Sequence, residues 1–458
     1  MKGLRGRRVV VVGLAQSGLA AVSALRDAGA RVVVTEARGA EELAGAASRA
    51  EAAGAEVFTG GHEPGHLEGA DLLITSPGVP ESAEVLRWAG ARRVPIWSEL
   101  ELGARVAAAP YIAVTGTNGK TTTTEMIAAI LRADGRDAVA CGNVGLPFTT
   151  AAGEGHDALV VEASSFQLRF HESFHPTVSV LLNLAPDHLD WHGSFAAYRE
   201  AKARVFALQG NEETHVGNRD DAHAASVSRE APCRVVWFTL AAPRPGEAGY
   251  AGGELVLRLD GDHVLGRPNA HTDSLRADAA AAAAAAVSFG ADPASAGAAL
   301  SRFDPPPHRG AVVAEVGGVR FVDDSKATNP HAALASLAGW SDVVLVAGGR
   351  SKGVDLSPLA AATDRLRGVV AIGEAAPELM GLFRNHVPVR TATTIESAVE
   401  KAFVMAPPGG TVLLAPACAS QDMFRDYAER GDRFTAAARS LARQGESHPL
   451  DPKGATHG

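Results

Sequence analysis

Short apolar runs alternate with longer segments of mixed polarity along most of this chain. Residues 8–12 are mostly valine, a glycine turn follows, and an alanine- and leucine-rich segment from about Leu19 to Ala28 leads to a second apolar run at 31–36. This order predicts a strand, a helix and a second strand that is parallel to the first. Further strands are expected at 71–75 and 94–97.

The alternation resumes after Pro110. Apolar runs that end in polar residues predict strands at 111–115, 138–145, 158–167 and 177–183. Residues 211–275 look irregular, and we expect little beyond loops and short strands there, such as one at 254–260. The alanine-rich segment 277–289 predicts a helix that Gly290 ends.

A third alternating part follows the proline-rich segment 303–310, which predicts a stiff linker and a hinge border. Its expected strands are 319–324, 342–349, 368–373 and 410–416. The polar tail from residue 446 to 458 is expected to be frayed. We therefore predict an α/β protein of three domains, at 1–108, 109–308 and 309–458, each a mostly parallel sheet with flanking helices.

The most informative stretch is the glycine turn after the strand at 111–115. Gly116 and Gly119 let backbone N–H groups turn toward one point, where the next helix presents its positive end. Lys120 suits the outer phosphates of a nucleotide, and the Thr121 hydroxyl suits Mg²⁺. The spacing is a shortened G-x-x-G-K-T. It predicts a phosphate-binding loop of the P-loop ATPase type, against the alternative of a plain turn with a solvated lysine.

Ligands of open α/β sheets collect at the carboxyl ends of the strands. The polar residues that should converge there on the loop phosphates are Asn143, Glu162, Asn183, Asp187 and His188. Glu162 is a natural Mg²⁺ ligand, although it could instead cap the helix that starts at Ser164. Read alone, His188 could equally be a core or surface histidine.

The first glycine turn, at residues 13–18, resembles a dinucleotide fingerprint only in part. Ala15 replaces the glycine that lets the backbone approach a pyrophosphate, while Glu36 stands where a ribose-binding acid would be. The turn therefore supports a nicotinamide site weakly. A plain turn, or a site for another nucleotide, fits as well. We expect the first and third domains to be Rossmann-like, because strands and helices alternate along both.

In the third domain, polar clusters follow three expected strands. They lie at 325–329, 350–355 and 418–422. A single lysine beyond a strand is usually a solvated charge. Two lysine-bearing clusters in one domain favour an anion-binding face.

Composition narrows the class of protein. The 458 residues are 46% hydrophobic and 21% charged, which is typical of globular chains. The net charge of −9 argues against nucleic-acid and acidic-membrane partners. The three cysteines (Cys141, Cys233 and Cys418) predict neither a disulfide framework nor a metal cluster. With no apolar run of about 18 residues and a strand rather than a signal peptide at the start, we expect no membrane span. The cysteine usage fits a reducing cytoplasm, and we expect a monomer.

Several motifs resemble one family, the ATP-dependent Mur ligases of peptidoglycan precursor synthesis. They are residues 115–121, 162–168, 308–309, 324–329, 348–353 and 416–420. The pair formed by 162–168 and 324–329 resembles the members that add D-glutamate. The resemblance covers nearly the whole chain in order.

The resemblance implies a defined reaction. ATP phosphorylates the L-alanyl carboxylate of UDP-N-acetylmuramoyl-L-alanine, and the amine of D-glutamate attacks the acyl phosphate. ATP and two Mg²⁺ ions are the implied cofactors. The first domain would bind the UDP-substrate, the second ATP and the third the amino acid.

The resemblance also implies residue roles. Catalytic roles fall to Lys120, His188, Lys202, which would be carbamylated, and Lys326. ATP contacts fall to Gly116, Thr117, Asn118, Gly119, Lys120, Thr121, Thr122, Asn143, Arg309 and Asp324. Metal ligands would be Thr121, Glu162, His188 and Lys202. The UDP-substrate would contact Gln16, Ser17, Glu36, Arg38, Ser76, Pro77, Gly78 and Asn143, and D-glutamate would contact Thr328, Lys352, Ser420 and Tyr427.

Some positions depart from the family pattern. The adenine-side His-Asn-x-x-Asn motif is not intact at 271–278, and Gln421 and Tyr427 stand where apolar residues are expected. Three other functions remain as alternatives. They are a relative that adds a different amino acid or extends folate, a non-catalytic nucleotide sensor, and a nicotinamide dehydrogenase.

Overall fold

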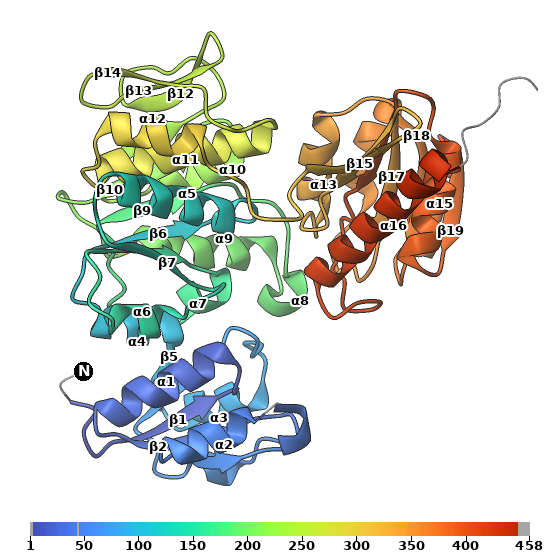
Figure 1. Ribbon diagram of the computed structural model, residues 1–458. Helices are drawn as coiled ribbons and strands as arrows, with labels where there is room; N and C mark the ends of the chain where they lie inside the picture. The colour runs from blue at the N-terminus through green and yellow to red at the C-terminus, as the bar shows by residue number, and fades with distance from the viewer. Residues whose placement is uncertain (1–2, 44, 448–458) are drawn as a thin grey trace, which may run out of the picture. The chain divides into compact units, whose positions relative to one another are not determined.

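The computed structural model describes residues 3–43 and 45–447. These residues form two compact units. The first contains the described residues up to 186 together with 191–271 and 275–303, and the second contains 187–190, 272–274 and the described residues from 304 onward. The α/β class that we predicted is confirmed in both (Figure 1).

The first unit begins with a five-stranded parallel sheet of order β3-β2-β1-β4-β5. Its strands are β1 (Arg8–Val12), β2 (Arg31–Thr35), β3 (Glu56–Phe58), β4 (Leu72–Thr75) and β5 (Ile96–Ser98). The accompanying helices are α1 (Gln16–Asp27), η1 (Ala40–Leu43), α2 (Ala46–Ala52), η2 (Pro64–Leu67), α3 (Glu84–Ala91) and α4 (Glu99–Val106). The central valine runs are wholly buried because apolar clusters cover both faces of the sheet.

Helix α1 begins at Gln16, three residues before the expected start at Leu19. The reason is Gly18, which packs directly on the preceding turn. A Cβ on Gly18 would lie 2.1 Å from the Gly13 carbonyl oxygen. Because glycine permits this approach, the first helical turn starts at the end of β1, and Gln16 and Ser17 lie in that turn.

A nine-stranded sheet of order β14-β13-β12-β11-β10-β9-β6-β8-β7 completes the first unit, with antiparallel pairing only among β12, β13 and β14. Its strands are β6 (Tyr111–Thr115), β7 (Ala138–Gly142), β8 (Ala158–Glu162), β9 (Val178–Leu181), β10 (Thr214–Asn218), β11 (Arg234–Phe238), β12 (Glu247–Ala251), β13 (Glu254–Arg258) and β14 (Asp262–Gly266). The helices of this part of the chain are α5 (Lys120–Ala133), α6 (Phe148–Ala152), α7 (Ser165–Arg169), α8 (Leu189–His192), α9 (Phe195–Ala203), η3 (Arg204–Phe206), α10 (Ala222–Ser228), α11 (Asp273–Ser288) and α12 (Pro293–Ser301). The first two residues of α8 and of α11 belong to the second unit.

The short strand expected at 254–260 is confirmed as β13, but the expectation that the rest of 211–275 is irregular is wrong, because four further strands and α10 lie in it. Strand β10 shows why the pattern misleads. Its His215 is fully buried, with Nδ1 2.7 Å from Ser179 Oγ and Nε2 2.9 Å from Ser228 Oγ. A buried polar residue whose hydrogen-bond partners lie on other elements cannot be recognised as a core residue from the sequence around it.

The alanine-rich helix α11 starts at Asp273, earlier than the expected Ala277, and ends before Gly290. Its residues 279–286 are all alanine and all buried in the core that α5 and the sheet share. The small side chains let the helix pack closely. The packed-helix interpretation of this run is confirmed.

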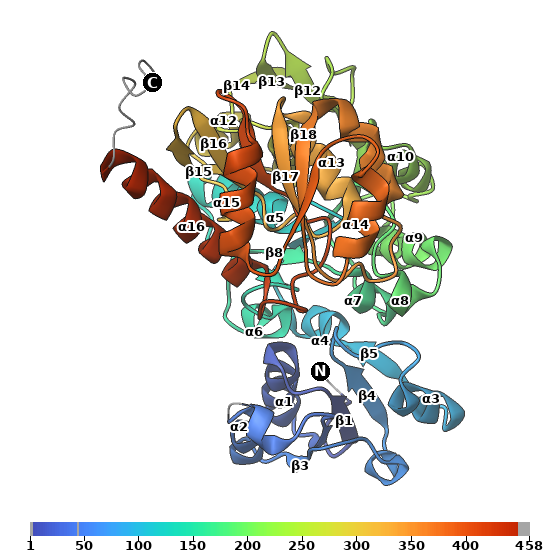
Figure 2. The ribbon, with the colours of Figure 1, turned by 90° about the vertical axis from the view of Figure 1, so that its right-hand side faces the viewer.

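The second unit contains a six-stranded sheet of order β15-β16-β20-β17-β18-β19, parallel except for the β15–β16 pair. Its strands are β15 (Ala311–Val316), β16 (Val319–Asp323), β17 (Val343–Gly348), β18 (Leu366–Ile372), β19 (Val389–Ala392) and β20 (Thr411–Leu414). Its helices are α13 (Pro330–Ala338), η4 (Ser357–Arg365), α14 (Ala376–Phe383), α15 (Ile395–Met405) and α16 (Tyr427–Ser447). Figure 2 shows α15 and α16 beside each other.

The four strands expected in this part correspond to β16, β17, β18 and β20, whereas the edge strands β15 and β19 were not expected. Of the tail expected to be frayed, residues 446–447 end α16, and 448–458 lie outside the described residues. Within residues 3–43 and 45–447, no helix is both long enough and apolar enough to cross a membrane.

Candidate active site

The loop between β6 and α5 requires its two glycines. A Cβ on Gly116 would lie 2.8 Å from Leu182 Cβ, and one on Gly119 would lie 2.3 Å from Asp278 Oδ1. Gly119 also has a φ of +85°, a left-handed conformation that glycine adopts without strain. The chain thus turns sharply into α5, whose first N–H groups end at this loop. That arrangement is suited to an anion.

Residues after β9 brace the loop from behind. Asn183 Oδ1 accepts a hydrogen bond from the Asn118 N–H at 2.8 Å, and Asn183 Nδ2 donates to the Asn118 carbonyl at 3.1 Å. Thr117 Oγ1 donates to the Ala185 carbonyl at 3.2 Å and lies 3.1 Å from the Tyr198 hydroxyl. The loop conformation is therefore fixed by the protein itself.

Two lysines approach the same loop. Lys120 Nζ donates to the carbonyls of Gly116 and Thr117 at 3.0 and 2.9 Å. Lys202, on α9 and 1% exposed, donates to the Gly116 carbonyl at 2.7 Å. Apart from the resemblance, no pattern in the sequence predicts that Lys202 lies here. The structure places it at the loop.

Glu162, at the end of β8, connects the loop to the neighbouring strand. Its Oε2 accepts from Thr121 Oγ1 at 2.7 Å, and its Oε1 accepts from Asn143 Nδ2 at 3.0 Å. Helix α7 is capped by Ser164, whose hydroxyl accepts from the Gln167 N–H. The alternative role of Glu162 as a helix cap is therefore wrong.

The pair of Glu162 and Thr121 fits a magnesium ion by its chemistry. Mg²⁺ favours oxygen ligands and is commonly held by one or two carboxylates together with substrate phosphates. Across the described residues, no group of three or more His, Cys, Asp or Glu side chains could hold a metal ion. Mg²⁺ held by one or two carboxylates usually completes its coordination with substrate phosphates and water.

At the carboxyl end of the first sheet, Glu36 organises the turn at 13–18. Its carboxylate accepts from the Leu14 N–H at 2.7 Å and from the Arg38 N–H and guanidinium at 2.9 to 3.1 Å. Burial raises the pKa of Glu36, but these hydrogen bonds outweigh it and hold the pKa at about 2. Ser76 Oγ donates to the Gly13 carbonyl at 3.3 Å. Glu36 and Ser76 thus both contact the turn at 13–18, and Arg38 is bonded to Glu36, so the three residues lie together at the carboxyl end of this sheet.

In the second unit, the loops after β16, β20 and β17 are neighbours because these strands are adjacent. Arg430 on α16 connects two of them and is completely buried. Its guanidinium donates to Ser325 Oγ at 2.9 Å, to the Ser325 carbonyl at 2.7 Å and to the Cys418 carbonyl at 3.2 Å. Burial lowers the pKa of Arg430 to about 10. It therefore remains a cation at neutral pH.

Arg430 thereby positions the loops that carry Lys326 and Ser420. Lys326 Nζ lies 3.7 Å from the centre of the Tyr427 ring, a cation–π contact. Lys352, with a φ of +57°, donates to Asp187 Oδ1 at 3.0 Å within the same unit. The lysines predicted from the third-domain clusters are thus held by specific partners. The expected convergence of Asp187 and His188 with Glu162 remains a prediction.

Arg309 and Asp324 lie near the start of this unit. Arg309 Nε is buried and has no hydrogen-bond partner among the described residues. A buried donor without a partner favours a ligand that supplies an acceptor. Its predicted ATP contact is compatible with this observation.

Asp324 predicts a pH dependence of stability. Burial raises the pKa of Asp324 to about 7, although a hydrogen bond from Ser336 and the charge of Arg309 lower it. The folded state binds the Asp324 proton more tightly than the unfolded state does. The stabilisation that this proton contributes to the free energy of unfolding is therefore complete below about pH 4 and is lost as the pH rises through about 7. We expect a slope of up to about 1.4 kcal/mol per pH unit between these values.

Thermal unfolding of wild type and of Asp324→Asn across this pH range tests the expectation. The variant cannot titrate at this position, so its unfolding midpoint should fall less steeply than that of wild type. Parallel curves would contradict the raised pKa.

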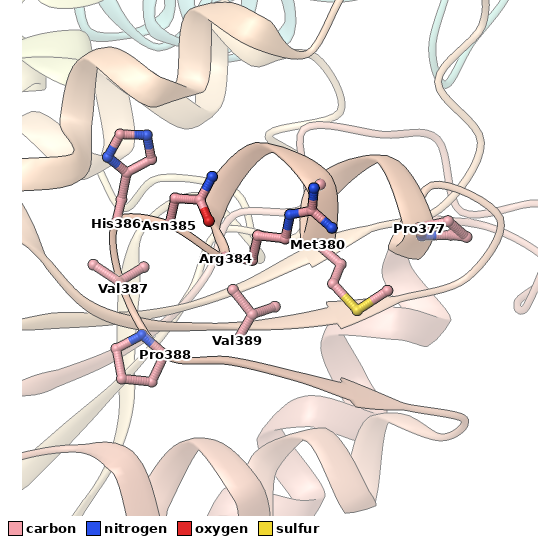
Figure 3. A pocket seen from close by; sticks show the side chains of 9 residues that line it. Pro377, Met380, Arg384, Asn385, His386, Val387, Pro388 and Val389 are labelled. Carbon is pink, nitrogen blue, oxygen red and sulfur yellow. The ribbon is translucent and has the colours of Figure 1, made fainter.

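A hollow lies elsewhere in the second unit, between the end of α14 and β19 (Figure 3). It measures about 530 Å³, and Met380, Arg384, Asn385 and His386 are among its lining residues. None of the predicted site residues lines it. The sequence predicts neither the role of Arg430 nor that of Asp278, the buried carboxylate beside Gly119, because a single charged residue on a helix carries no local sign of a buried contact.

Together, the glycine loop, its lysines and the carboxylate one strand away form an arrangement suited to phosphate at the end of an α/β sheet. Three family models match the chain. They are the Mur ligase MurD-like N-terminal domain at 7–98, the Mur ligase middle domain at 114–267 and the Mur ligase glutamate ligase domain at 308–418. The chain belongs to the Mur ligase family.

Relatives extend along nearly its whole length. A protein of Frankia casuarinae is 47% identical over 96% of this chain and 95% of its own length, and one of Thermobifida fusca is 42% identical over 96% and 99%. Both are named UDP-N-acetylmuramoylalanine–D-glutamate ligase.

Solved structures support the fold. The pseudomurein peptide ligase type C of Methanothermus fervidus aligns with a TM-score of 0.61 at 19% identity, over 95% of this chain and 100% of that one. The MurF ligase of Thermotoga maritima, solved in complex with ADP, aligns with a TM-score of 0.60 at 18% identity, over 97% and 100%.

Proposed function

We propose that this chain is an ATP-dependent ligase that joins the amine of D-glutamate to the L-alanyl carboxylate of UDP-N-acetylmuramoyl-L-alanine, in peptidoglycan precursor synthesis. The observation that carries the reaction class is the contact of Thr121 with Glu162 beside the Gly116–Lys120 loop. The amino acid is supported by relatives of 42% and 47% identity that carry this activity in their names.

An amine cannot displace oxide from a carboxylate, so the carboxylate must first be activated. Phosphoryl transfer from ATP turns the L-alanyl carboxylate into an acyl phosphate, the amine attacks the carbonyl carbon, and phosphate leaves. The first N–H groups of α5 and the Lys120 ammonium would hold the outer phosphates and stabilise charge on the transferred group. Lys120 donates now to two loop carbonyls, so phosphate oxygens would replace these acceptors.

Thr121 and Glu162 would hold Mg²⁺, with Asn143 orienting the carboxylate. A bound Mg²⁺ supplies charge neutralisation at the outer phosphates. A second ion, with His188 and a carbamylated Lys202 as ligands, belongs to the proposal through the family resemblance. The Lys202 amine already lies against the loop.

The remaining substrate-binding roles fall to residues at the ends of the first sheet and of the six-stranded sheet. Glu36, Arg38 and Ser76, with Gln16, Ser17, Pro77 and Gly78, would bind the UDP-substrate. Arg309 and Asp324 would contact ATP. For D-glutamate, the Lys352 ammonium suits a carboxylate, with Thr328, Ser420 and Tyr427 as further contacts. Cytoplasmic location and a monomeric state belong to the proposal as well.

Phosphate release tests the amino-acid specificity. With ATP, Mg²⁺ and UDP-N-acetylmuramoyl-L-alanine, we expect release with D-glutamate and little with L-glutamate or meso-diaminopimelate. Release with meso-diaminopimelate but not with D-glutamate would identify a different ligase. Release with neither, but tight ATP binding, would favour a nucleotide sensor.

A further inference from the structure

Two histidines meet a single hydroxyl at the carboxyl end of β2. Thr35 Oγ1 lies 2.9 Å from His62 Nδ1 and 3.0 Å from His66 Nδ1. Thr35 directly precedes Glu36, whose carboxylate holds the glycine turn of the first sheet. The two imidazoles therefore lie at the same end of β2 as the residues at which the UDP-substrate is proposed to bind, although neither is among the residues assigned to it.

The hydrogen bonds determine which histidine donates. The Glu63 N–H donates to His66 Nδ1 at 3.2 Å, so this nitrogen carries no proton. Both contacts to Thr35 Oγ1 are hydrogen bonds when its single proton points to His66 Nδ1. His62 Nδ1 can contact the same oxygen only as a donor. His62 is consequently the tautomer with its proton on Nδ1, and its Nε2 is an acceptor.

The imidazole rings of His62 and His66 differ in their other contacts. His66 is part of a capping box with Glu63 at the start of η2, and its ring stacks on Phe58 with centroids 4.3 Å apart. These contacts give His66 a structural role. His62 is half-buried, and among the described residues its Nε2 has no hydrogen-bond partner.

The segment that carries His62 is joined to the Glu36 segment by its backbone. The Gly61 N–H donates to the Glu36 carbonyl at 3.1 Å, and the Gly60 N–H donates to the Arg38 carbonyl at 2.8 Å. Burial lowers the pKa of His62, while the Glu36 charge raises it and His66 lowers it further. His62 thus stands as a neutral acceptor, on a fixed segment beside Glu36 and Arg38.

We propose that His62 is a specificity-determining residue for the UDP-linked substrate, whose uridine donates a hydrogen bond to His62 Nε2. The inference rests on the proposed function. An acceptor needs a donor, which the diphosphate does not offer at neutral pH. The uridine offers two kinds, the ribose hydroxyls and the uracil N3–H.

Calorimetric titration of the full chain with UDP tests this role. His62→Asn keeps an N–H near the position of Nδ1, for Thr35, and removes the acceptor. His62→Phe removes both. Loss of one neutral hydrogen bond should weaken UDP binding roughly 3- to 10-fold in each variant. His263→Phe, at an exposed position on β14, is the matched control and should bind UDP as wild type does.

A second titration with 2′-deoxy-UDP separates the two donors. If the 2′-hydroxyl donates, wild type and His62→Asn bind the deoxy compound equally; if another uridine donor is used, the difference between them persists. Both results support the role. Equal UDP affinity of wild type and both His62 variants overturns it and leaves the proposed function standing. Failure of wild type to bind UDP overturns both.

Discussion

Replacement of Lys120 by alanine is expected to lower kcat by about 10²- to 10³-fold, the usual loss when one preorganised donor to a developing charge is removed. The fold should be retained, because Asn183 and Tyr198 brace the loop without Lys120. The measurement is phosphate release at saturating ATP, with the KM for ATP determined alongside it.

Lys401→Ala is a suitable control, since Lys401 on α15 donates to the Thr391 carbonyl on β19 and has no proposed role. It should retain wild-type turnover. A Lys120→Ala enzyme with near-normal kcat and a raised KM for ATP would limit Lys120 to binding.

Replacement of Arg430 by methionine is expected to destabilise the second unit by about 3 kcal/mol and to raise the KM for D-glutamate. Three buried acceptors lose their donor, at about 1 to 3 kcal/mol each, while the relief from burying a charge offsets part of that cost. The loops with Lys326 and Ser420 lose their common anchor. Thermal unfolding and D-glutamate kinetics measure the two effects.

Arg439 lies on the same helix, is exposed and donates to the Val313 carbonyl at 3.3 Å. Arg439→Met should leave both quantities close to wild type. If Arg430→Met unfolded at the wild-type temperature with an unchanged KM, the positioning role assigned to Arg430 would be wrong.

The strands β1 and β2 and the glycine loop at 116–119 were predictable because local sequence determines them. The valine runs of β1 and β2 are buried on both faces, so they read as continuous apolar segments. The close approaches of Gly116 and Gly119 require glycine, and that requirement is visible as a motif. Glu162 was predictable as well, since it ends a recognisable strand.

The unpredicted features depend on partners that are distant in the sequence. Strand β10 carries a buried histidine that Ser179 and Ser228 satisfy. Arg430 donates to residues 105 and 12 positions away, and its own helix reads as an ordinary surface helix. The contacts of Thr35 with His62 and His66 determine which ring nitrogen of His62 carries the proton. Such roles arise from folding and leave no local pattern.

The acyl phosphate is the central step of the proposed reaction, and an oxygen label follows it directly. With UDP-N-acetylmuramoyl-L-alanine that carries ¹⁸O in its carboxylate, ATP and D-glutamate, the phosphate released should contain one ¹⁸O atom per amide formed. Mass spectrometry of the phosphate makes the measurement. Amide formation with unlabelled phosphate would contradict an acyl-phosphate intermediate.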